Sequence, residues 1–127
     1  MTESQMRFGL FRNHPNARAY ARDTPVFREG DLGDTMFAIK SGRVAIIVNG
    51  SVVDELGAGD IFGEMALLER QPRTASAVAQ EDSELVEIDR TQFYLLVKQN
   101  PHFALQLLQL FSERLRRANV LYTKAAP

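Results

Sequence analysis

The feature that most constrains the fold is a series of short apolar runs, each followed by a turn that contains glycine. The runs are residues 26–28, 36–39, 44–48 and 52–56, and the turns after them contain Gly30, Gly42, Gly50 and the pair Gly57 and Gly59. Short strands with turns at this spacing are typical of an all-β sandwich or barrel. The sequence therefore predicts that the middle of the chain folds as β-sheet.

The dipeptide Asn49-Gly50 gives the most specific local prediction. Both residues tolerate the positive φ that a tight two-residue turn requires. We therefore expect residues 43–48 and 51–56 to pair as an antiparallel hairpin. Two further extended segments, residues 74–79 and 84–88, complete the predicted strands.

Beyond residue 88 the apolar residues recur at the helical spacing of about 3.6. Asp89 is a favourable N-cap for a helix over residues 90–98. Asn100 followed by Pro101 supplies an N-cap and a first-turn proline for a second helix over residues 101–123. The sequence thus predicts two helices at the end of the chain.

The second of these helices carries one apolar stripe. Its members recur at steps of three or four residues and are Ala104, Leu108, Phe111, Leu115, Ala118 and Tyr122. A stripe of this kind buries against other elements. One edge of it can pack on the predicted sheets, and the other can pair with the same helix of a second subunit.

Length and composition indicate one globular domain without thiol chemistry. The chain has 127 residues, of which 45% are hydrophobic and 24% charged, and its net charge of -1 gives no basic excess for nucleic acid. It contains no cysteine, which excludes disulfides and cysteine-ligated metals. No apolar run approaches the roughly 18–20 residues needed to cross a bilayer, so we expect a cytoplasmic protein. We expect a leader over residues 1–24, with a short helix at most, and the domain over residues 25–127.

The candidate site lies between a predicted strand at residues 60–62 and the next one. Gly63 lets the backbone approach a ligand, and residues 64–69 are good helix formers. The first amides of a helix lack internal partners and carry partial positive charge, so the backbone of residues 63–66 is a natural cradle for a phosphate. Arg73 can close the cradle, because its planar guanidinium matches two phosphate oxygens.

Glu64 needs a different partner, since a carboxylate accepts hydrogen bonds and repels phosphate. A ribose hydroxyl can donate such a bond. In a 3′,5′-cyclic nucleotide the 2′-hydroxyl is the only free ribose hydroxyl, so one acceptor beside one anion cradle matches its sugar phosphate. Glu64 and Arg73 together therefore predict a cyclic nucleotide as the ligand.

The stretch from Phe62-Gly-Glu-Met-Ala-Leu-Leu to Pro72-Arg-Thr-Ala-Ser-Ala77 resembles the phosphate-binding cassette of cyclic-nucleotide-binding domains. Such domains occur in catabolite-activator-type regulators, kinase regulatory subunits and nucleotide-gated channels. The resemblance extends over about residues 25–122, including residues 27–39 and the turn at residues 56–63. It implies a mainly β fold, a double-stranded β-helix or jelly-roll-like β-roll, closed by C-terminal helices.

The resemblance also implies the ligand-binding residues. The amides of Gly63, Met65 and Ala66 and the side chain of Arg73 would hold the phosphate, Glu64 the ribose hydroxyl, and Thr74 would lie beside the phosphate and near the base. The base-capping residue comes from the final helix, where the candidates are Arg116, Arg117, Leu121 and Tyr122. A hydroxyl at the place of Thr74 occurs in family members that prefer cyclic GMP and in bacterial members that bind cyclic AMP. We favour cyclic AMP over cyclic GMP, and Thr74 does not decide between them.

The predicted function is a sensor that relays ligand binding through its C-terminal helices. We expect the last helix to move at the junction Gln99-Asn100-Pro101 and to pass the signal to a protein effector or a second subunit. Related regulators carry a helix-turn-helix after the closing helices, and only residues 123–127 remain here, so we expect no direct DNA binding.

Two alternatives stand beside this prediction. A non-catalytic interaction module can keep the same fold with a pocket that is empty or binds another anion. A β-roll can also hold a catalytic metal in a cluster of histidines and a carboxylate, but this chain has only His14, in the leader, and His102, at a helix start. We therefore expect no catalysis and no metal.

Overall fold

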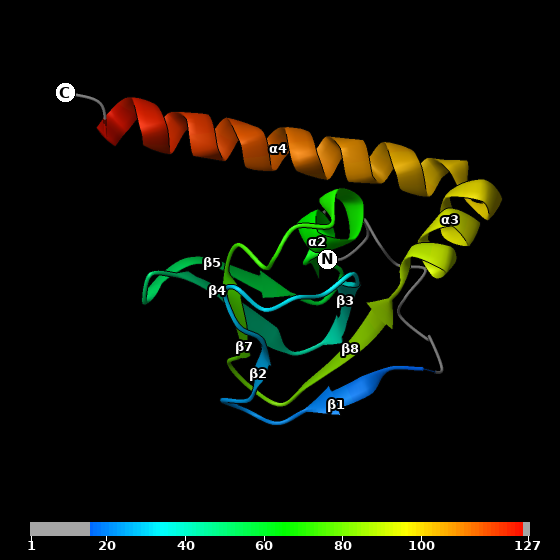
Figure 1. The fold of residues 1–127 in the computed structure, drawn as a ribbon, viewed down its shortest axis with the longest axis horizontal. Coiled ribbons are helices and arrows are strands. Elements are labelled where there is room, and N and C mark those ends of the chain that lie inside the picture. The colour runs from blue at the N-terminus through cyan, green and yellow to red at the C-terminus, as the bar shows by residue number, and fades with distance from the viewer. Residues whose placement is uncertain (1–15, 126–127) are drawn as a thin grey trace. The chain divides into compact units, whose positions relative to one another are not determined.

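The computed structural model describes residues 16–125, with side chains described for residues 16–118. In chain order its elements are β1 (Arg18–Tyr20), β2 (Pro25–Phe27), β3 (Met36–Ser41), β4 (Arg43–Val48), β5 (Ser51–Gly57), β6 (Ile61–Phe62), α2 (Glu64–Glu69), β7 (Ser76–Ala79), β8 (Ser83–Ile88), α3 (Arg90–Gln99) and α4 (Pro101–Ala125) (Figure 1). The chain divides into two compact units, Met1–Phe93 and Tyr94–Pro127.

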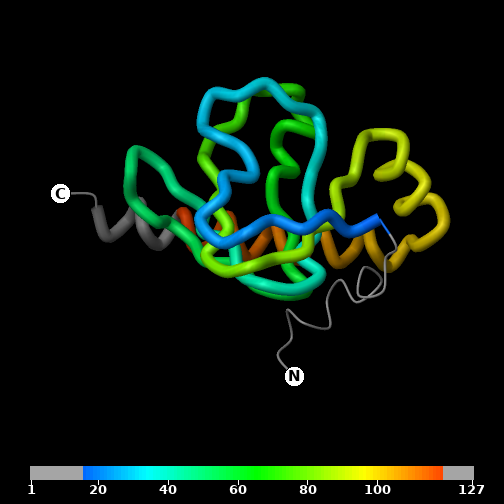
Figure 2. Tube along the Cα trace, turned by 90° about the horizontal axis from the view of Figure 1, so that it is seen from below, coloured from blue at the N-terminus to red at the C-terminus, as the bar shows by residue number. Residues whose placement is uncertain are grey.

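The first unit contains two 4-stranded sheets, with the strand orders β1-β8-β3-β6 and β2-β7-β4-β5, and every pairing in them is antiparallel. Among the strands of the described residues, only β4 and β5 are neighbours both in the sheet and along the chain. Figure 2 shows β1, in blue, beside β8, in yellow-green, although most of the unit's sequence separates them. The sheets are therefore built from strands that are distant in sequence.

The core of this unit lies between the two sheets. Its central cluster takes Phe37, Ile39, Phe62 and Leu85 from one sheet and Val44, Leu56 and Ala77 from the other. Burying a large apolar side chain stabilises a fold by about 1.5–3 kcal/mol, so contacts between the sheets hold the unit together. This architecture confirms the predicted mainly β fold of jelly-roll type followed by helices.

The hairpin predicted at Asn49-Gly50 is present. β4 and β5 pair antiparallel, with Val48 opposite Ser51. The φ angles are 51° at Asn49 and 79° at Gly50. Positive φ at both central residues is typical of the type I′ turn, whose twist matches that of the strands it joins.

Strand β1 is a difference from the sequence analysis. It lies in the stretch assigned to a leader with a short helix at most, and Tyr20 stands opposite Ser83 of β8. Three residues are too few to show the alternation that identifies a strand, so only the pairing partner reveals it. The Arg18 guanidinium lies 5.5 Å from the centroid of the Tyr20 ring, a cation–π contact along the same strand. Residues 1–15 of the expected leader lie outside the described residues.

The start of α3 follows the prediction, whereas Asn100 behaves differently. Asp89 Oδ1 accepts a hydrogen bond from the Gln92 amide at 2.8 Å, and Gln92 Oε1 accepts one from the Asp89 amide at 2.9 Å, which is a capping box. α4 begins at Pro101 as predicted, with Asn100 at the N-cap position, but the Asn100 side chain donates to the carbonyl of Leu96 at 3.4 Å and does not cap α4. The Phe103 amide is bonded to the backbone carbonyl of Asn100 instead. The Asn100 side chain therefore closes α3 and does not open α4.

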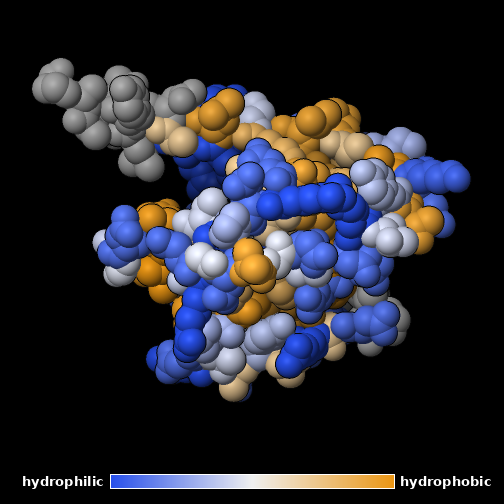
Figure 3. Space-filling view, in the orientation of Figure 1, coloured by the Kyte–Doolittle hydropathy of each residue, from blue (hydrophilic) through white to orange (hydrophobic). Residues whose placement is uncertain are grey.

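In α4 the buried side chains are not those of the predicted stripe. Phe103, Leu107 and Leu110 are buried, each one position before a stripe member, whereas Leu108 and Leu115 are 65% and 62% exposed. Figure 3 shows apolar residues at the surface along α4. The sequence has apolar residues at adjacent positions of this helix, so periodicity fits two neighbouring faces equally well. The side chain of Tyr122 lies outside the described residues.

A membrane-spanning segment is not found among the helices of the described residues, since none combines the required length with sufficient hydropathy.

Candidate functional site

The candidate site begins where β6 ends and α2 starts. Gly63 occupies the N-cap of α2 with φ 79° and ψ 9°, a left-handed conformation that glycine adopts without strain. A Cβ added at Gly63 would lie 3.0 Å from Arg73 Nη1 and 3.3 Å from a ring atom of Phe27. Both the backbone conformation and the close packing therefore favour glycine at this position.

Helix α2 presents different side chains to the interior and to solvent. Glu64 and Ala66 are buried, with 8% and 2% of their surfaces exposed, whereas Met65 is 44% exposed. The expected helix over residues 64–69 is thus present, and its first turn buries a carboxylate. Burying an ionisable carboxyl group is costly unless it is well solvated by hydrogen bonds or used by a ligand.

Arg73 links α2 to the loop before β3. Its Nη1 donates to the carbonyl of Thr35 at 2.8 Å and to the carbonyl of Gly63 at 3.0 Å, and its Nη2 donates to Thr35 Oγ1 at 3.3 Å. Its backbone amide donates to the Asp31 carbonyl, and its own carbonyl accepts from the Gly30 amide. Backbone and side chain together therefore fix Arg73 against the Gly30–Thr35 loop.

Aromatic rings cover the guanidinium of Arg73. Its Cζ lies 4.2 Å from the centroid of Phe27 and 5.8 Å from that of Phe37. The Phe37 ring in turn stacks on Phe62 with centroids 5.3 Å apart. Only 7% of the surface of Arg73 is exposed. The site is therefore a buried positive charge packed against aromatic rings.

The electrostatics of Arg73 reflect its burial. Desolvation lowers the pKa of its guanidinium, and the nearby carboxylates of Glu87, Asp34 and Asp31 oppose that shift. A guanidinium stays protonated in proteins even when its pKa is lowered, so Arg73 remains a cation. Arg73 is therefore a permanent, partly desolvated positive charge, and an anion bound beside it would be stabilised.

The structure brings part of the predicted site together. Gly63 and Arg73 are joined by a hydrogen bond, and Glu64 and Ala66 lie buried at the start of the same helix. Thr74 follows Arg73 directly and is exposed. The sequence analysis assigned the guanidinium of Arg73 to a phosphate, whereas in the structure Nη1 donates to two protein carbonyls. The ligand-binding roles of these residues stay predictions.

Sequence reasoning missed the residues that hold Arg73. They are Thr35, whose carbonyl and hydroxyl both accept from the guanidinium, and the rings of Phe27 and Phe37. Gly33 belongs with them, because a Cβ there would lie 2.8 Å from Arg73 Nη2. The only local signal is the loop sequence Gly30-Asp-Leu-Gly-Asp-Thr35, whose two glycines indicate a close approach without naming the partner.

The candidates for capping the base all lie on α4. Arg116 and Arg117 are exposed on α4, and the side chains of Leu121 and Tyr122 lie outside the described residues. Within residues 16–118, no group of three or more histidine or acidic side chains is placed to hold a metal ion.

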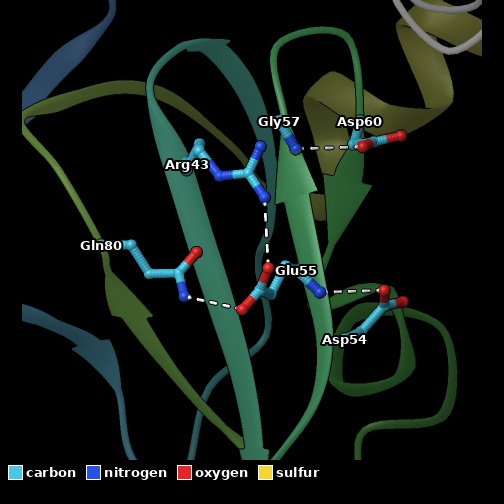
Figure 4. Close-up of polar contacts among 6 residues, drawn as sticks. All are labelled: Arg43, Asp54, Glu55, Gly57, Asp60 and Gln80. Carbon is cyan, nitrogen blue, oxygen red and sulfur yellow. Dashed lines mark hydrogen bonds and ion pairs between the residues drawn. The ribbon is translucent and has the colours of Figure 1, made fainter.

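A second polar cluster lies on the sheet formed by β4, β5 and β7. Figure 4 shows Glu55 accepting hydrogen bonds from Arg43 Nη2 and Gln80 Nε2, each at 3.2 Å. The side chains of Arg43 and Glu55 are 52% and 49% exposed, and an ion pair this exposed contributes little to stability. The cluster joins neighbouring strands and contains no cation without a carboxylate partner.

The sequence model of the family described as "Cyclic nucleotide-binding domain" matches residues 17–100. This match includes the whole candidate site and both sheets. It begins just before β1 and ends at the residue between α3 and α4.

Individual relatives agree with this match. The chain is 38% identical over 108 residues to the cyclic AMP receptor protein of Thermus thermophilus, covering 81% of this chain and 50% of the relative. The crystal structure of the Thermus thermophilus catabolite activator protein superposes with a TM-score of 0.78 at 34% identity, covering 93% of this chain and 58% of that one. A cyclic nucleotide-binding domain from Methylobacillus flagellatus superposes with a TM-score of 0.76 at 30% identity, covering 87% and 68%. The chain thus spans about half the length of the receptor protein it matches.

Proposed function

Because this chain belongs to the cyclic nucleotide-binding domain family, we propose that it is a sensor that binds a cyclic nucleotide through Arg73, Glu64 and the start of α2. The observation that carries the proposal is the environment of Arg73. Its guanidinium is buried, yet within the described residues its side-chain hydrogen bonds go only to neutral oxygens, those of Thr35 and Gly63. A buried cation without a bonded carboxylate favours an anionic ligand.

The phosphate of a cyclic nucleotide supplies that anion. A guanidinium and a phosphate form charge-assisted hydrogen bonds that are stronger than those between neutral groups. By family resemblance, the amides of Gly63, Met65 and Ala66 complete the phosphate site, and Thr74 lies beside it. The left-handed backbone at Gly63 and its contact with Arg73 support this assignment, because they bring the start of α2 and the guanidinium into one place.

Glu64 has the complementary role in this proposal. Its carboxylate is buried at the start of α2, next in sequence to the residue that contacts Arg73. A carboxylate there accepts a hydrogen bond from the ribose 2′-hydroxyl and disfavours ligands that present a second phosphate at that place. The site is thereby suited to a nucleoside 3′,5′-cyclic monophosphate.

We favour cyclic AMP over cyclic GMP as the ligand. The support is the 38% identity to a Thermus thermophilus relative named a cyclic AMP receptor protein. Thr74 is exposed and does not decide between the two bases.

The signal is proposed to leave through the C-terminal helices. The helical structure is interrupted at Asn100, between α3 and α4. The Asn100 side chain bonds to the last turn of α3, and Pro101 is the first residue of α4. A ligand shifts a conformational equilibrium only by its differential affinity for the two states, so binding must favour one arrangement at this junction. The proposed receiver is a protein effector or a second subunit that contacts α4. A cytoplasmic location stays a prediction.

The direct test is calorimetry with cyclic AMP and cyclic GMP on the unmodified protein and on Arg73→Ala. We expect Arg73→Ala to lose about 2–5 kcal/mol of binding free energy, because it leaves the phosphate without its counter-charge. Arg28→Ala is the matched control, since Arg28 is an exposed arginine of the same unit, and it should bind normally. Unchanged affinity in Arg73→Ala would contradict the assignment.

Because Arg73 also holds the loop before β3, its removal can destabilise the fold. Thermal unfolding of Arg73→Ala measures the loss of stability separately from the loss of binding. Arg73→Lys is measured alongside it, because lysine keeps the charge but loses the planar fork. In the unmodified protein, ligand at 100 times its dissociation constant should add about 2.7 kcal/mol to stability.

The alternative function is a non-catalytic interaction module whose site is empty or binds another anion. The observation that favours it is that Arg73 already satisfies part of its hydrogen-bonding capacity with protein oxygens. A thermal-shift screen with cyclic AMP, cyclic GMP, cyclic dinucleotides and inorganic phosphate discriminates between the two. No shift with either cyclic mononucleotide would favour the interaction module.

A further inference from the structure

We propose that Thr35 and Glu87 are positioning residues for Arg73, and that they fix which edge of its guanidinium faces the bound anion. The inference rests on the proposed function, since it concerns how the same arginine meets the phosphate. Neither residue belongs to the cassette at residues 62–77 that resembles the family's binding segment. Thr35 contacts Arg73 from the loop before β3, and Glu87 contacts Thr35 from β8.

Thr35 occupies one edge of the guanidinium with two acceptors. Its carbonyl accepts from Nη1 at 2.8 Å and its Oγ1 accepts from Nη2 at 3.3 Å. The second hydrogen of Nη1 goes to the Gly63 carbonyl at 3.0 Å. A guanidinium has five N–H donors, so these bonds leave the Nε hydrogen and one Nη2 hydrogen. The edge between Nε and Nη2 is therefore the one that remains for a bidentate contact with phosphate.

Glu87 determines the direction of the Thr35 hydroxyl. Thr35 Oγ1 lies 3.1 Å from Glu87 Oε1 and donates to it. A hydroxyl has one hydrogen and two lone pairs, an ionised carboxylate only accepts, and a guanidinium only donates. The hydroxyl must therefore give its hydrogen to Glu87 and offer a lone pair to Arg73. The hydrogen bonds that link Arg73, Thr35 and Glu87 can therefore run in only one direction, from Arg73 to Thr35 to Glu87. This holds the guanidinium in one orientation.

The sheet register explains why Glu87 is available. β3 and β8 pair antiparallel with Phe37 opposite Glu87 and Met36 opposite Ile88, so the end of β8 lies beside the loop that leads into β3. Glu87 is exposed, while its neighbours Val86 and Ile88 are buried. Its carboxylate thus projects from the sheet where Thr35 begins the approach to β3.

Gly33 lies close beside the remaining edge of Arg73. An ideal Cβ at Gly33 would lie 2.8 Å from Nη2 and 3.0 Å from Nε, the two nitrogens left for the ligand. Any side chain at this position would occupy the space beside that edge. The loop therefore orients Arg73 through Thr35, and the glycine at position 33 places no side chain beside the edge proposed for the anion.

The test compares binding of the two phosphorothioate diastereomers of cyclic AMP, Sp and Rp, which place sulfur on different exocyclic positions of the phosphate. Thr35→Val removes the hydroxyl at nearly constant shape, and we expect about tenfold weaker binding of cyclic AMP, as for loss of one hydrogen bond to a charged group. We also expect the ratio of Sp to Rp affinities to change, because a reoriented guanidinium meets a different oxygen. Thr35→Ser restores the hydroxyl and should restore both values.

Glu87→Gln should change the same ratio, since an amide can also donate and no longer fixes the sense of the hydroxyl. Glu84→Gln is the matched control, an exposed glutamate of the same strand, and should leave the ratio unchanged. If Thr35→Val fails to fold by thermal unfolding, Glu87→Gln carries the test alone.

Equal weakening of both diastereomers in Thr35→Val and Glu87→Gln would overturn the inference, because it would indicate damaged packing only. Unchanged affinity and ratio in both variants would overturn it as well. Failure of the unmodified protein to bind cyclic AMP and cyclic GMP is a distinct result, which contradicts the proposed function itself.

Discussion

At the scale of single residues, the contacts of Arg73 show a structural role, and its binding role is proposed. Its side chain holds together the loop at Thr35 and the start of α2 at Gly63. The sequence predicts its charge and its place after the cassette helix, because both follow from residue type and spacing. The partners of Arg73 could not be predicted, since Thr35 is 38 positions away and only the folded chain brings it near.

The role of Glu64 gives a test at this scale. Glu64→Gln should weaken binding of cyclic AMP by about 1.5–3 kcal/mol, the range for a hydrogen bond to a charged group, because the acceptor for the 2′-hydroxyl loses its charge. Binding of 2′-deoxy cyclic AMP, which lacks that hydroxyl, should not change. Isothermal titration with both ligands provides the measurement.

Glu69→Gln is the control for this experiment, because Glu69 is an exposed glutamate of the same helix. It should bind both ligands as the unmodified protein does. A parallel loss for cyclic AMP and its 2′-deoxy analogue in Glu64→Gln would show that Glu64 acts on the fold and not on the hydroxyl.

Gly42 supplies a second test, of packing in the first unit. A Cβ at Gly42 would lie 2.0 Å from Ser83 Oγ and 2.6 Å from Ser83 Cα, whereas a Cβ at Gly50 would meet nothing within 4 Å. Both glycines have positive φ, so the backbone strain of an alanine is common to the two positions. We expect Gly42→Ala to lower the free energy of unfolding by about 1–3 kcal/mol more than Gly50→Ala does. Urea denaturation measures both, and equal losses would contradict the close approach.

At the scale of elements, the sequence predicted those structures that a few adjacent residues determine by themselves. The Asn49-Gly50 hairpin and the capping box at Asp89 each depend on a few adjacent residues whose side chains or φ angles are sufficient. β1 has no such signal and exists because β8 offers a free edge. The predicted face of α4 was one position away from the buried one, because neighbouring apolar residues fit both.

The contact between α2 and α3 gives a test at this scale. Arg90 Nη2, at the start of α3, donates to the carbonyl of Leu67 in the last turn of α2. Carbonyls at helix ends lack partners within the helix, so this bond satisfies one that would otherwise be unpaired. Arg90→Met should lower the free energy of unfolding by about 1–2 kcal/mol.

Arg28→Met is the control, since it removes an exposed arginine from the same unit at similar cost in charge. Urea denaturation of both variants provides the comparison. An equal shift of the denaturation midpoint would mean that the bond from Arg90 to Leu67 adds nothing.

At the scale of the whole molecule, the sequence predicted the class of fold and, except for β1, the order of its elements, but of the strand pairings it predicted only that of β4 with β5. β7 pairs with β2 on one side and β4 on the other, and β8 with β1 and β3. These pairings join segments that are far apart in sequence, and strand patterns alone do not encode which neighbour a strand selects. The resemblance to a known family implied the fold as a unit, which local patterns could not do.

The proposed relay is a property of the whole molecule and can be measured by hydrogen exchange. Cyclic AMP should change the exchange rates of amides in Tyr94–Pro127, and most of all around the junction at residues 99–101. The reason is linkage: a ligand that binds one arrangement of this junction more tightly raises its population, and local opening energies report that shift. In Arg73→Ala at the same ligand concentration these changes should disappear, because the ligand is no longer held. If exchange slows around residues 63–74 while Tyr94–Pro127 is unaffected, the domain binds its ligand without relaying it through α4, and the effector must contact the first unit instead.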